Sequence, residues 1–414
     1  MKRRVIVIGA GAAGTMAAIF AARGGAETIL LERTRDGGRK ILISGGGRCN
    51  VLPIALDETR FVTDSSPNTL RKILRSWPLA EQVRFFEEQL AIPLVEEHES
   101  GKRFPASHRA RDVRDGLLAH ARESGVDIRF DTLVSDVAPQ EGGWRVSIAG
   151  STGLDTDAVI VATGGLSVPN TGSDGAGLGI LAALGHTMHP TYAALTPLTA
   201  DAPQFAALSG VSLTVTLTAH HPNRSATATG GFLFTHRGYS GPAVLNVSHV
   251  AVRSRVEPPL ARLTARWSPL GEAEWERALG PQASRTVQGA LRAELPDRLA
   301  AVLAAMAEVD PLRSLADLRR DERRRLIEVL VRGSLPWSGD EGYRKAEVTG
   351  GGVALADVHP RTLESRRHAG LYLCGEVLDA FGPIGGYNFC WAWATGRAAG
   401  TAAAAAVGAA TAER

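Results

Sequence analysis

The sequence predicts an α/β fold in which one parallel sheet is assembled from both ends of the chain. At the start, the β-branched run Val5–Ile8 leads through a glycine-rich turn into Ala12–Arg23, a helical stretch of small residues, and then into the apolar run Thr28–Leu31. At the other end, the apolar strand Gly370–Leu373 again enters a glycine-rich turn and a helix. The long segment between them has a different pattern, so we expect one discontinuous domain interrupted by an insertion.

The composition is that of an ordinary globular protein. A chain of 414 residues is too long for one core, so two or three domains are expected. Hydrophobic residues make up 44% and charged residues 21%, which argues against general disorder. The formal net charge of +3 argues against a protein built mainly to coat nucleic acid.

Neither cysteine usage nor the chain ends predict export or a membrane anchor. The three cysteines form no C-x-x-C pair, so no metal site or dithiol centre is indicated, and their sparse number is typical of a reducing cytoplasm. The basic start imitates an export signal, but the glycines that follow fit a different role. The alanine-rich tail, Ala398–Thr411, is too short and too weakly apolar to span a bilayer. We expect a cytoplasmic protein with no membrane partner.

The rest of the chain divides by its hydrophobic pattern. Helical spacing occurs at Leu79–Leu90 and Arg111–Ser124, and strands are predicted at Asp127–Phe130, Trp144–Ile148 and Ala158–Val161. After about His189, alternation predicts strands at Ser212–Thr218, Gly231–Thr235 and Leu260–Trp267, followed by a helical pattern over Glu272–Arg332. The expected domains are residues 1–191 with 343–414 for dinucleotide binding, 192–271 for a β-rich domain, 272–332 for a helical domain, and 333–342 for a return through the β-rich domain.

The first glycine-rich turn has the spacing G-x-G-x-x-G between a strand and a helix. Gly9 permits the tight turn, Gly11 lets the backbone approach a pyrophosphate, and Gly14 allows close packing of helix on strand. Glu32 lies 18 residues after Gly14, near the roughly 20 expected for a carboxylate that binds ribose hydroxyls. This arrangement predicts a Rossmann-type dinucleotide site.

The late segment favours FAD over NAD. The last strand stops at Gly375-Glu376, then Asp379 follows, and residues 385–388 open a helix. In FAD-binding folds such a strand brings its acidic end to the ribityl chain, and the next helix points its N-terminus at the flavin pyrimidine ring. That helix end would stabilise negative charge on reduced flavin.

Two further turns suit close approach of backbone to a dinucleotide. Ser44–Asn50 contains three consecutive glycines beside Arg48, although a flexible surface loop with a solvated arginine is the alternative. Val159–Gly165 is a buried strand running into small residues, as expected under the adenosine half. Residues 172–177 offer a second glycine pattern without a preceding strand–helix–strand unit, so we expect no separate NAD(P) domain.

The chain resembles the YhiN/BaiN-like family of bacterial flavoproteins, which includes aminoacetone oxidase-like enzymes. The resemblance is carried by GRKILISGGGRCN (38–50), ATGGLSVPNTGSDGAGLGILAALGH (162–186), LFTHRGYSGPAVLNVS (233–248), YRKAEVTGGGV (343–353) and the block at 359–400. It implies a glutathione-reductase-like FAD domain with an inserted β-barrel-like domain and a small helical domain. The residues expected to line a non-covalently bound FAD are Gly9, Gly11, Ala12, Ala13, Gly14, Glu32, Arg33, Lys40, Ser44, Gly45, Gly46, Gly47, Arg48, Cys49, Asn50, Val134 (near the adenine), Ala162, Thr163, Gly164, Gly165, Gly375, Glu376, Asp379, Gly385, Gly386, Tyr387 and Asn388.

The resemblance implies an oxidoreductase that uses hydride transfer at flavin N5. Its substrate would be a small molecule, with reduction of an activated C=C bond or oxidation of an aminoketone as the reaction and NAD(P)H as a transient reductant. Reduction of uridine in ribosomal RNA and a non-enzymatic redox sensor are the alternatives. Candidate proton donors are His236 and Tyr239, and His236 is the better one because imidazole ordinarily titrates near neutral pH. The alternative for His236 is a purely local hydrogen bond, and for Cys49 a buried, inert thiol.

Two basic clusters bear on the RNA alternative. The run Arg319–Arg325 interleaves arginines with acids, which is typical of a solvated helix face. A joint surface with a second cluster could hold a phosphate backbone. The second cluster consists of Arg71, Lys72, Arg75, Lys102, Arg103, Arg109 and Arg111.

Overall fold

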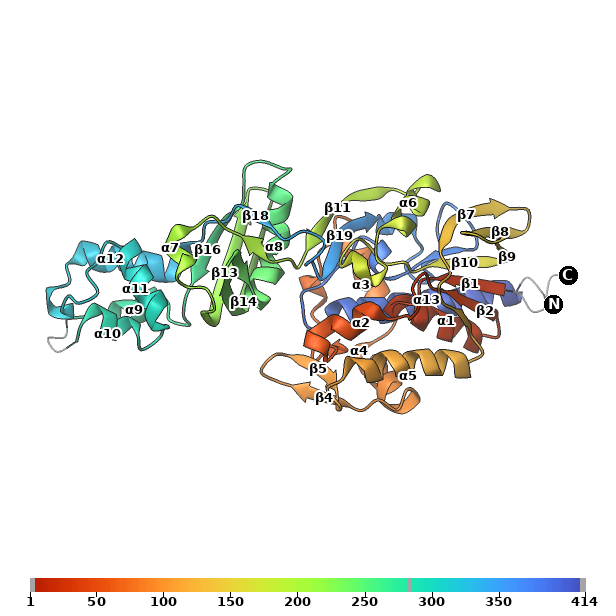
Figure 1. Ribbon diagram of the computed structural model, residues 1–414, viewed down its shortest axis with the longest axis horizontal. Helices are drawn as coiled ribbons and strands as arrows, with labels where there is room; N and C mark the ends of the chain where they lie inside the picture. The colour runs from red at the N-terminus through yellow and green to blue at the C-terminus, as the bar shows by residue number, and fades with distance from the viewer. Residues whose placement is uncertain (1–3, 282–284, 410–414) are drawn as a thin grey trace. The chain divides into compact units, whose positions relative to one another are not determined.

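The computed structural model describes residues 4–281 and 285–409, so the basic start and the last residues of the alanine-rich tail lie outside it. The chain divides into two compact units (Figure 1). Unit 1 comprises residues 1–191 and 348–414, and unit 2 comprises residues 192–347. Each unit has its own cluster of buried hydrophobic side chains. No helix in the described part of the chain combines the length and hydropathy needed to cross a bilayer.

Unit 1 contains a five-stranded parallel sheet in the order β20-β10-β1-β2-β6. Its strands are β1 (Arg4–Ile8), β2 (Glu27–Leu31), β6 (Asp127–Arg129), β10 (Ala158–Val161) and β20 (Leu371–Leu373). The middle strands β10, β1 and β2 are almost wholly buried, which explains why they are apolar without alternation. Because β20, from the end of the chain, pairs with β10, the predicted joining of the two ends is confirmed.

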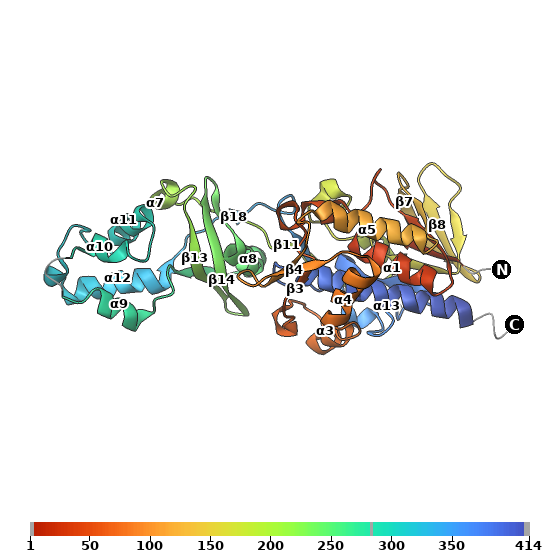
Figure 2. The ribbon, with the colours of Figure 1, turned by 90° about the horizontal axis from the view of Figure 1, so that it is seen from below.

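Two helices of small residues pack side by side against this sheet. These are α1 (Ala12–Arg23) and α13 (Tyr387–Ala409), which lie next to each other in both views (Figures 1 and 2). A Cβ at Gly396 or at Gly400 of α13 would overlap a backbone carbonyl oxygen of α1. The G-x-x-x-G spacing therefore lets the two helix backbones touch.

The remaining elements of unit 1 surround this core. The helices are α2 (Arg39–Ile43), α3 (Pro67–Leu74), α4 (Leu79–Arg84), α5 (Ala110–Glu123) and α6 (Ala176–Ala183). The strands are β3 (Leu52–Pro53), β4 (Leu94–Glu97), β5 (Lys102–Pro105), β7 (Val134–Gln140), β8 (Gly143–Ile148), β9 (Leu154–Thr156), β11 (Met188–Ala194), which runs on into unit 2, and β19 (Val348–Val353). The helix expected at Leu79–Leu90 is only α-helical in its first half, and a π-helical turn at Phe85–Gln89 follows.

Unit 2 contains a seven-stranded antiparallel sheet in the order β17-β16-β13-β14-β15-β12-β18. Its strands are β12 (Leu198–Thr199), β13 (Ser212–His221), β14 (Arg224–Thr235), β15 (Gly238–Ser240), β16 (Arg262–Arg266), β17 (Gly333–Ser334) and β18 (Gly339–Asp340). The helices are α7 (Pro203–Ala206), α8 (Pro242–Ser254), α9 (Glu272–Ala278), α10 (Val287–Leu291), α11 (Asp297–Met306) and α12 (Arg320–Arg332). β14 is longer than the predicted Gly231–Thr235, because cross-strand threonine pairs such as Thr218–Thr227 extend its pairing with β13.

Candidate functional site

Three glycine turns meet at the carboxyl edge of the parallel sheet of unit 1. They follow β1 at Gly9, β10 at Gly164 and β20 at Gly375. A Cβ at Gly9 would stand 2.7 Å from the carbonyl oxygen of Ala162, and one at Gly375 would stand 2.7 Å from the Cβ of Ala13. The turns therefore pack directly on one another, at the edge where open α/β sheets bind their ligands.

Two glycines of the first turn differ in what surrounds them. A Cβ at Gly14 would overlap the carbonyl oxygen of Gly9, so this glycine is required for helix packing. A Cβ at Gly11 would meet no protein atom within 4 Å, and its backbone is extended, with φ −78°. Space is therefore left beside Gly11, at the N-terminus of α1, where the motif places a pyrophosphate.

Glu32 holds the first turn in place from the end of β2. Its Oε2 accepts a hydrogen bond from the backbone of Ala10 (2.8 Å), and its Oε1 accepts from the backbone and hydroxyl of Thr34 (both 2.8 Å). The adjacent Arg33 forms an ion pair with Asp174. Contacts of Glu32 and Arg33 with a cofactor stay predictions.

Lys40 and Glu376, both predicted site residues, form a half-buried ion pair at this edge (2.6 Å). Lys40 also donates to the hydroxyl of Ser167, and the second oxygen of Glu376 accepts from Ser167 Oγ (2.6 Å) and from the backbone of Thr349 (2.9 Å). Burial opposes ionisation of Glu376, but the charge of Lys40 and these hydrogen bonds outweigh it and lower its pKa. Residues from four distant stretches of chain are thus joined around one carboxylate.

The predicted triple-glycine loop forms a short turn, Ser44–Gly47, after α2. Gly45, Gly46 and Gly47 all have positive φ, and a Cβ at Gly46 or Gly47 would meet nothing within 4 Å. The loop is therefore open towards a ligand on its glycine face.

Arg48 and Cys49 follow this loop in different surroundings. Arg48 pairs with Glu97 (3.0 Å) and lies 4.1 Å over the ring of Phe104. Cys49 is fully buried, and burial raises the pKa of its thiol to about 12. The burial of Cys49 agrees with the interpretation of an inert thiol, which stays a prediction.

Unsatisfied polar atoms show that these residues fit a bound FAD. Asn50 Oδ1 and Thr163 Oγ1 are buried and have no hydrogen-bond partner among the described residues. Buried polar atoms are almost always paired, so both atoms call for a ligand or water. The open positions at Gly11, Gly46 and Gly47 and these two atoms together leave room and hydrogen-bonding groups for a ligand such as FAD, which we call the cradle.

The N-terminus of α13 is shaped by a tight loop. The side-chain amide of Asn388 accepts from the backbone of Gly382 (2.9 Å) and donates to its carbonyl (3.0 Å). Tyr387 donates to the carbonyl of Ala55 (3.3 Å). A Cβ at Gly386 would collide with the backbone of β3, and the side chain of Lys102 lies against Gly385. Asn388 therefore positions the loop, and direct contact with a cofactor stays a prediction.

A polar cluster around Asp379 joins residues that the sequence did not indicate. Asp379 is 2% exposed, and its Oδ2 accepts from Ser65 and Thr63 hydroxyls and from the backbones of Asp64 and Ser65 (all 2.9 Å). The imidazole of His189 lies beside it, with Nε2 3.3 Å from Ser65 Oγ. Ser65 and His189 have no local sequence signal, because only the tertiary fold brings them to Asp379.

Val134 and the two catalytic candidates lie elsewhere. Val134 begins β7 and is buried, and its predicted adenine contact is not tested. His236 is exposed in the two-residue turn between β14 and β15 of unit 2. Tyr239 is 1% exposed inside the aromatic core of unit 2, and burial raises the pKa of its hydroxyl. Their roles as proton donors stay predictions.

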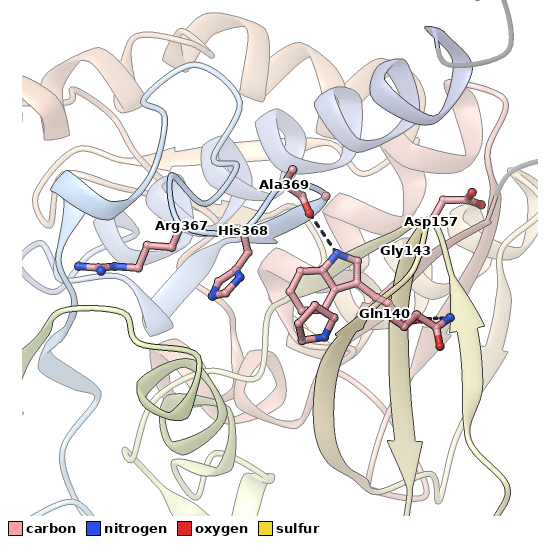
Figure 3. Close-up of a pocket in the computed structure, with 10 residues that line it drawn as sticks. Gln140, Gly143, Asp157, Arg367, His368 and Ala369 are labelled. Carbon is pink, nitrogen blue, oxygen red and sulfur yellow. Dashed lines mark hydrogen bonds between the residues drawn. The ribbon is translucent and has the colours of Figure 1, made fainter. Parts of the chain in front are cut away.

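A surface pocket of about 470 Å³ lies at the opposite, amino edge of the sheet (Figure 3). It is lined by the β7–β8 turn, Asp157 before β10, and residues 367–370 before β20. Within the described chain its polar groups already have partners: Trp144 donates to Ala369, His368 Nε2 lies 2.7 Å from a carbonyl oxygen, and Arg367 pairs with Asp357. The pocket therefore carries no evident chemistry.

The charge run of α12 is largely paired. Arg325 binds Asp321, and Arg319 and Arg313 bind Glu322. Arg323 donates to carbonyl oxygens. Such pairing is what a solvated helix face requires.

Comparisons with known proteins agree with this geometry. The family model described as the HI0933-like protein Rossmann domain matches residues 3–402. The ribosomal RNA dihydrouridine synthase of Escherichia coli is 32% identical over 412 residues, covering 94% of this chain and 95% of that protein. The 3-dehydro-bile acid delta(4,6)-reductase of Clostridium scindens is 32% identical over 409 residues, covering 97% and 99%. The crystal structure of 3-ketosteroid delta1-dehydrogenase from Sterolibacterium denitrificans shares the fold, with a TM-score of 0.55 at 13% identity, covering 97% and 99%.

Proposed function

Because the chain belongs to the HI0933-like family, and is thus a flavin-dependent oxidoreductase, we propose that it binds FAD non-covalently in unit 1 and reduces an activated C=C bond of a small molecule. The resemblance inferred from the sequence is confirmed by the family match. NAD(P)H is the proposed reductant. Oxidation of an aminoketone is the second reaction open to the same site.

The observation that carries this proposal is the open backbone cradle at the carboxyl edge of the sheet. Gly11, Gly46 and Gly47 leave space beside them, and Asn50 and Thr163 each have a polar atom without a protein partner. The choice of C=C reduction is supported by the reductase of Clostridium scindens, whose similarity spans both units.

The residues of this chain would have distinct tasks towards the bound group. Backbone N–H groups at Gly11 and the α1 N-terminus would bind the pyrophosphate. Glu376, held by Lys40, would accept ribityl hydroxyls, and the N-terminus of α13 would favour negative charge on the pyrimidine ring. FAD supplies hydride chemistry when bound, while the protein orients the substrate and delivers the proton.

Reduction of uridine in ribosomal RNA is the second candidate, supported by the similarity to the synthase of Escherichia coli. Arg320 and Arg324 of α12 are exposed, and neither has an ion pair within the described residues. They would add only a small basic surface, so the RNA reaction ranks below small-molecule reduction.

Anaerobic absorption spectroscopy of the purified chain tests the proposal. We expect NADH or NADPH to bleach the bound flavin, and a steroid enone such as 4-androstene-3,17-dione or the small enone 2-cyclohexenone to restore its colour. Recovery of colour only with unmodified ribosomal RNA would instead support the second candidate. No recovery with any of these acceptors would contradict both.

A further inference from the structure

We propose that His189, positioned by Ser65 and Asp379, donates the proton that completes C=C reduction. This inference rests on the proposed function and names a proton source for it within unit 1. It is carried by the hydrogen bonds of three residues that lie far apart in the sequence.

Hydrogen bonds hold the buried carboxyl group of Asp379 in one position. The backbone N–H groups of Asp64 and Ser65 and the Ser65 hydroxyl each donate to its Oδ2 at 2.9 Å, and the Thr63 hydroxyl lies 2.9 Å from Oδ2 and 2.7 Å from the backbone carbonyl of Asp379. An ionised carboxylate only accepts hydrogen bonds, so the hydroxyl of Ser65 must donate to it. The neighbouring backbone N–H of Leu355 donates to the same hydroxyl oxygen (2.9 Å).

These bonds determine which nitrogen of His189 carries a proton in the neutral ring. Because the one proton of the Ser65 hydroxyl is given to Asp379, His189 Nε2 at 3.3 Å can only donate to Ser65 Oγ. Nδ1 is then the ring nitrogen left to act on a substrate. It has no hydrogen-bond partner among the described residues, and the side chain is 26% exposed, so Nδ1 is free to face a substrate.

A second histidine–carboxylate pair in unit 1, His98 with Glu96, shows how the surroundings of His189 and Asp379 differ from those of a surface pair. His98 Nε2 lies 3.5 Å from Glu96, nearly the same separation as the 3.6 Å between His189 Nε2 and Asp379 Oδ2. The side chains of His98 and Glu96 are 79% and 37% exposed, so water screens their interaction. Asp379 is 2% exposed, so its contact with His189 is far less open to water than the contact between Glu96 and His98.

The cluster lies within the same loops as the predicted flavin contacts. Asp379 falls between Glu376 and Gly385 in the chain, and its backbone N–H donates to Val353 of β19 (2.9 Å). The same strand donates from Thr349 to Glu376 (2.9 Å), and its Gly351 touches the backbone of His189. β19 therefore ties His189 and Asp379 to the carboxylate proposed to hold the ribityl chain.

The proposed step is balanced. A bound, reduced flavin would supply the hydride for a C–H bond at one alkene carbon, and the proton on His189 Nδ1 would form the second C–H bond at the other. The π bond would break, and the substrate would gain the two electrons that the flavin would lose. His189 is left as the neutral Nε2–H tautomer and regains a proton from water, while NAD(P)H supplies the electrons for the next turnover.

The experiment follows reoxidation of dithionite-reduced holoenzyme by 4-androstene-3,17-dione and 2-cyclohexenone under anaerobic conditions. The variants are His189→Gln and His189→Ala, with His98→Gln as the matched control and His236→Gln as the competing donor. Flavin content and the rate of reduction by NADPH are measured for each, because neither needs a proton from the protein.

We expect both His189 variants to keep FAD and to be reduced at the wild-type rate, but to be reoxidised about 100-fold more slowly or worse. Added imidazole should restore part of the rate to His189→Ala and none to His189→Gln. The His98 variant should behave as wild type, while a loss in His236→Gln would identify His236 as the donor instead.

Other results would overturn the inference in distinguishable ways. Unchanged reoxidation in the His189 variants, or a loss confined to His236→Gln, would remove His189 as the donor while leaving the proposed function intact. Loss of FAD from both His189 variants would show a structural role instead. Failure of the wild-type chain to be reoxidised by either enone would remove the proposed function, and this inference with it.

Discussion

Both units contain buried polar atoms without a hydrogen-bond partner among the described residues, but the surroundings of these atoms differ. In unit 1, Asn50 Oδ1 and Thr163 Oγ1 lack partners among the described residues and lie against Gly45 and Gly177, in the glycine-rich loops of the candidate site. In unit 2, Tyr239 Oη and Trp267 Nε1 likewise lack partners within the described residues, but they lie inside a cluster of aromatic rings. An unsatisfied atom indicates a ligand in the first setting and a local cost to stability in the second.

The difference suggests that unit 1 is shaped for ligand binding and unit 2 for the packing of large side chains. Unit 1 achieves its shape through backbone approaches that only glycine allows, such as Gly14 on Gly9 and Gly400 on α1. Unit 2 fills its core with large side chains instead, among them Phe232, Phe234 and Trp267. Substitutions in the two units should therefore have separable effects on flavin binding and on unfolding.

Replacing Trp267 by Ala should have the largest effect on stability. Trp267 is 1% exposed and stacks on Phe234 with ring centroids 5.9 Å apart, so the change leaves a large cavity and should cost about 3–5 kcal/mol. Chemical denaturation would measure this, with flavin absorbance followed in parallel. Flavin release at the same denaturant concentration as the unfolding of unit 2 would contradict the expectation that flavin binding and the stability of unit 2 are independent.

Replacing Gly400 by Leu should destabilise unit 1 by about 1–3 kcal/mol and weaken flavin binding. The new side chain would overlap the carbonyl of Ala17 and push α13 away from α1. A Cβ added at Gly408, near the end of α13, would meet no atom within 4 Å, so Gly408→Leu is the matched control. Equal thermal stability of the two variants would contradict the proposed packing.

Replacing Lys40 by Met should lower the free energy of unfolding, measured by chemical denaturation, by about 1–3 kcal/mol, because it leaves the carboxylate of Glu376 without its cation.

The lowered pKa of Glu376 also predicts a pH dependence of stability. Its stabilising contribution is complete above the ordinary value of 4.5 and is lost as pH falls through the lower, folded-state pKa. In Glu376→Gln, the slope of unfolding free energy against pH should be shallower in that acidic range. An unchanged slope would count against the ion pair.

Replacing Tyr239 by Phe should have the smallest effect, between no change and a stabilisation of about 1 kcal/mol. The hydroxyl has no hydrogen-bond partner in the described chain, so its removal relieves a desolvation cost. Steady-state reduction of 2-cyclohexenone should proceed at the wild-type rate. A fall of 10-fold or more would instead support Tyr239 as a proton donor.

The sequence predicts the parallel sheet and its glycine turns well, because these depend on local patterns. Short stretches of sequence are enough to predict these elements. They are the apolar run Val5–Ile8, the spacing of Gly9, Gly11 and Gly14, and the second strand and glycine-rich turn that begin at Gly370. β14 is longer than predicted, because its first half is polar and pairs with β13 of the same hairpin through threonines such as Thr227 and Thr229, which carry no hydrophobic alternation.

The partners of the site residues could not be predicted in the same way. Lys40 and Glu376 were each expected at the site, but their ion pair joins residues 336 positions apart. His189 and Ser65 carry no motif at all, and their meeting at Asp379 depends on how β19 and the loop after β20 pack. Tertiary packing alone supplies that information.

The most direct test of the central claim is the flavin content of Gly11→Val compared with wild type. The added side chain meets no protein atom within 4 Å of its Cβ and needs no unusual φ, so the variant should fold with unchanged circular dichroism. The account predicts yellow wild-type protein with one FAD per chain and a colourless variant that excess FAD does not restore. A variant that binds FAD as tightly as wild type would contradict a cradle at this turn.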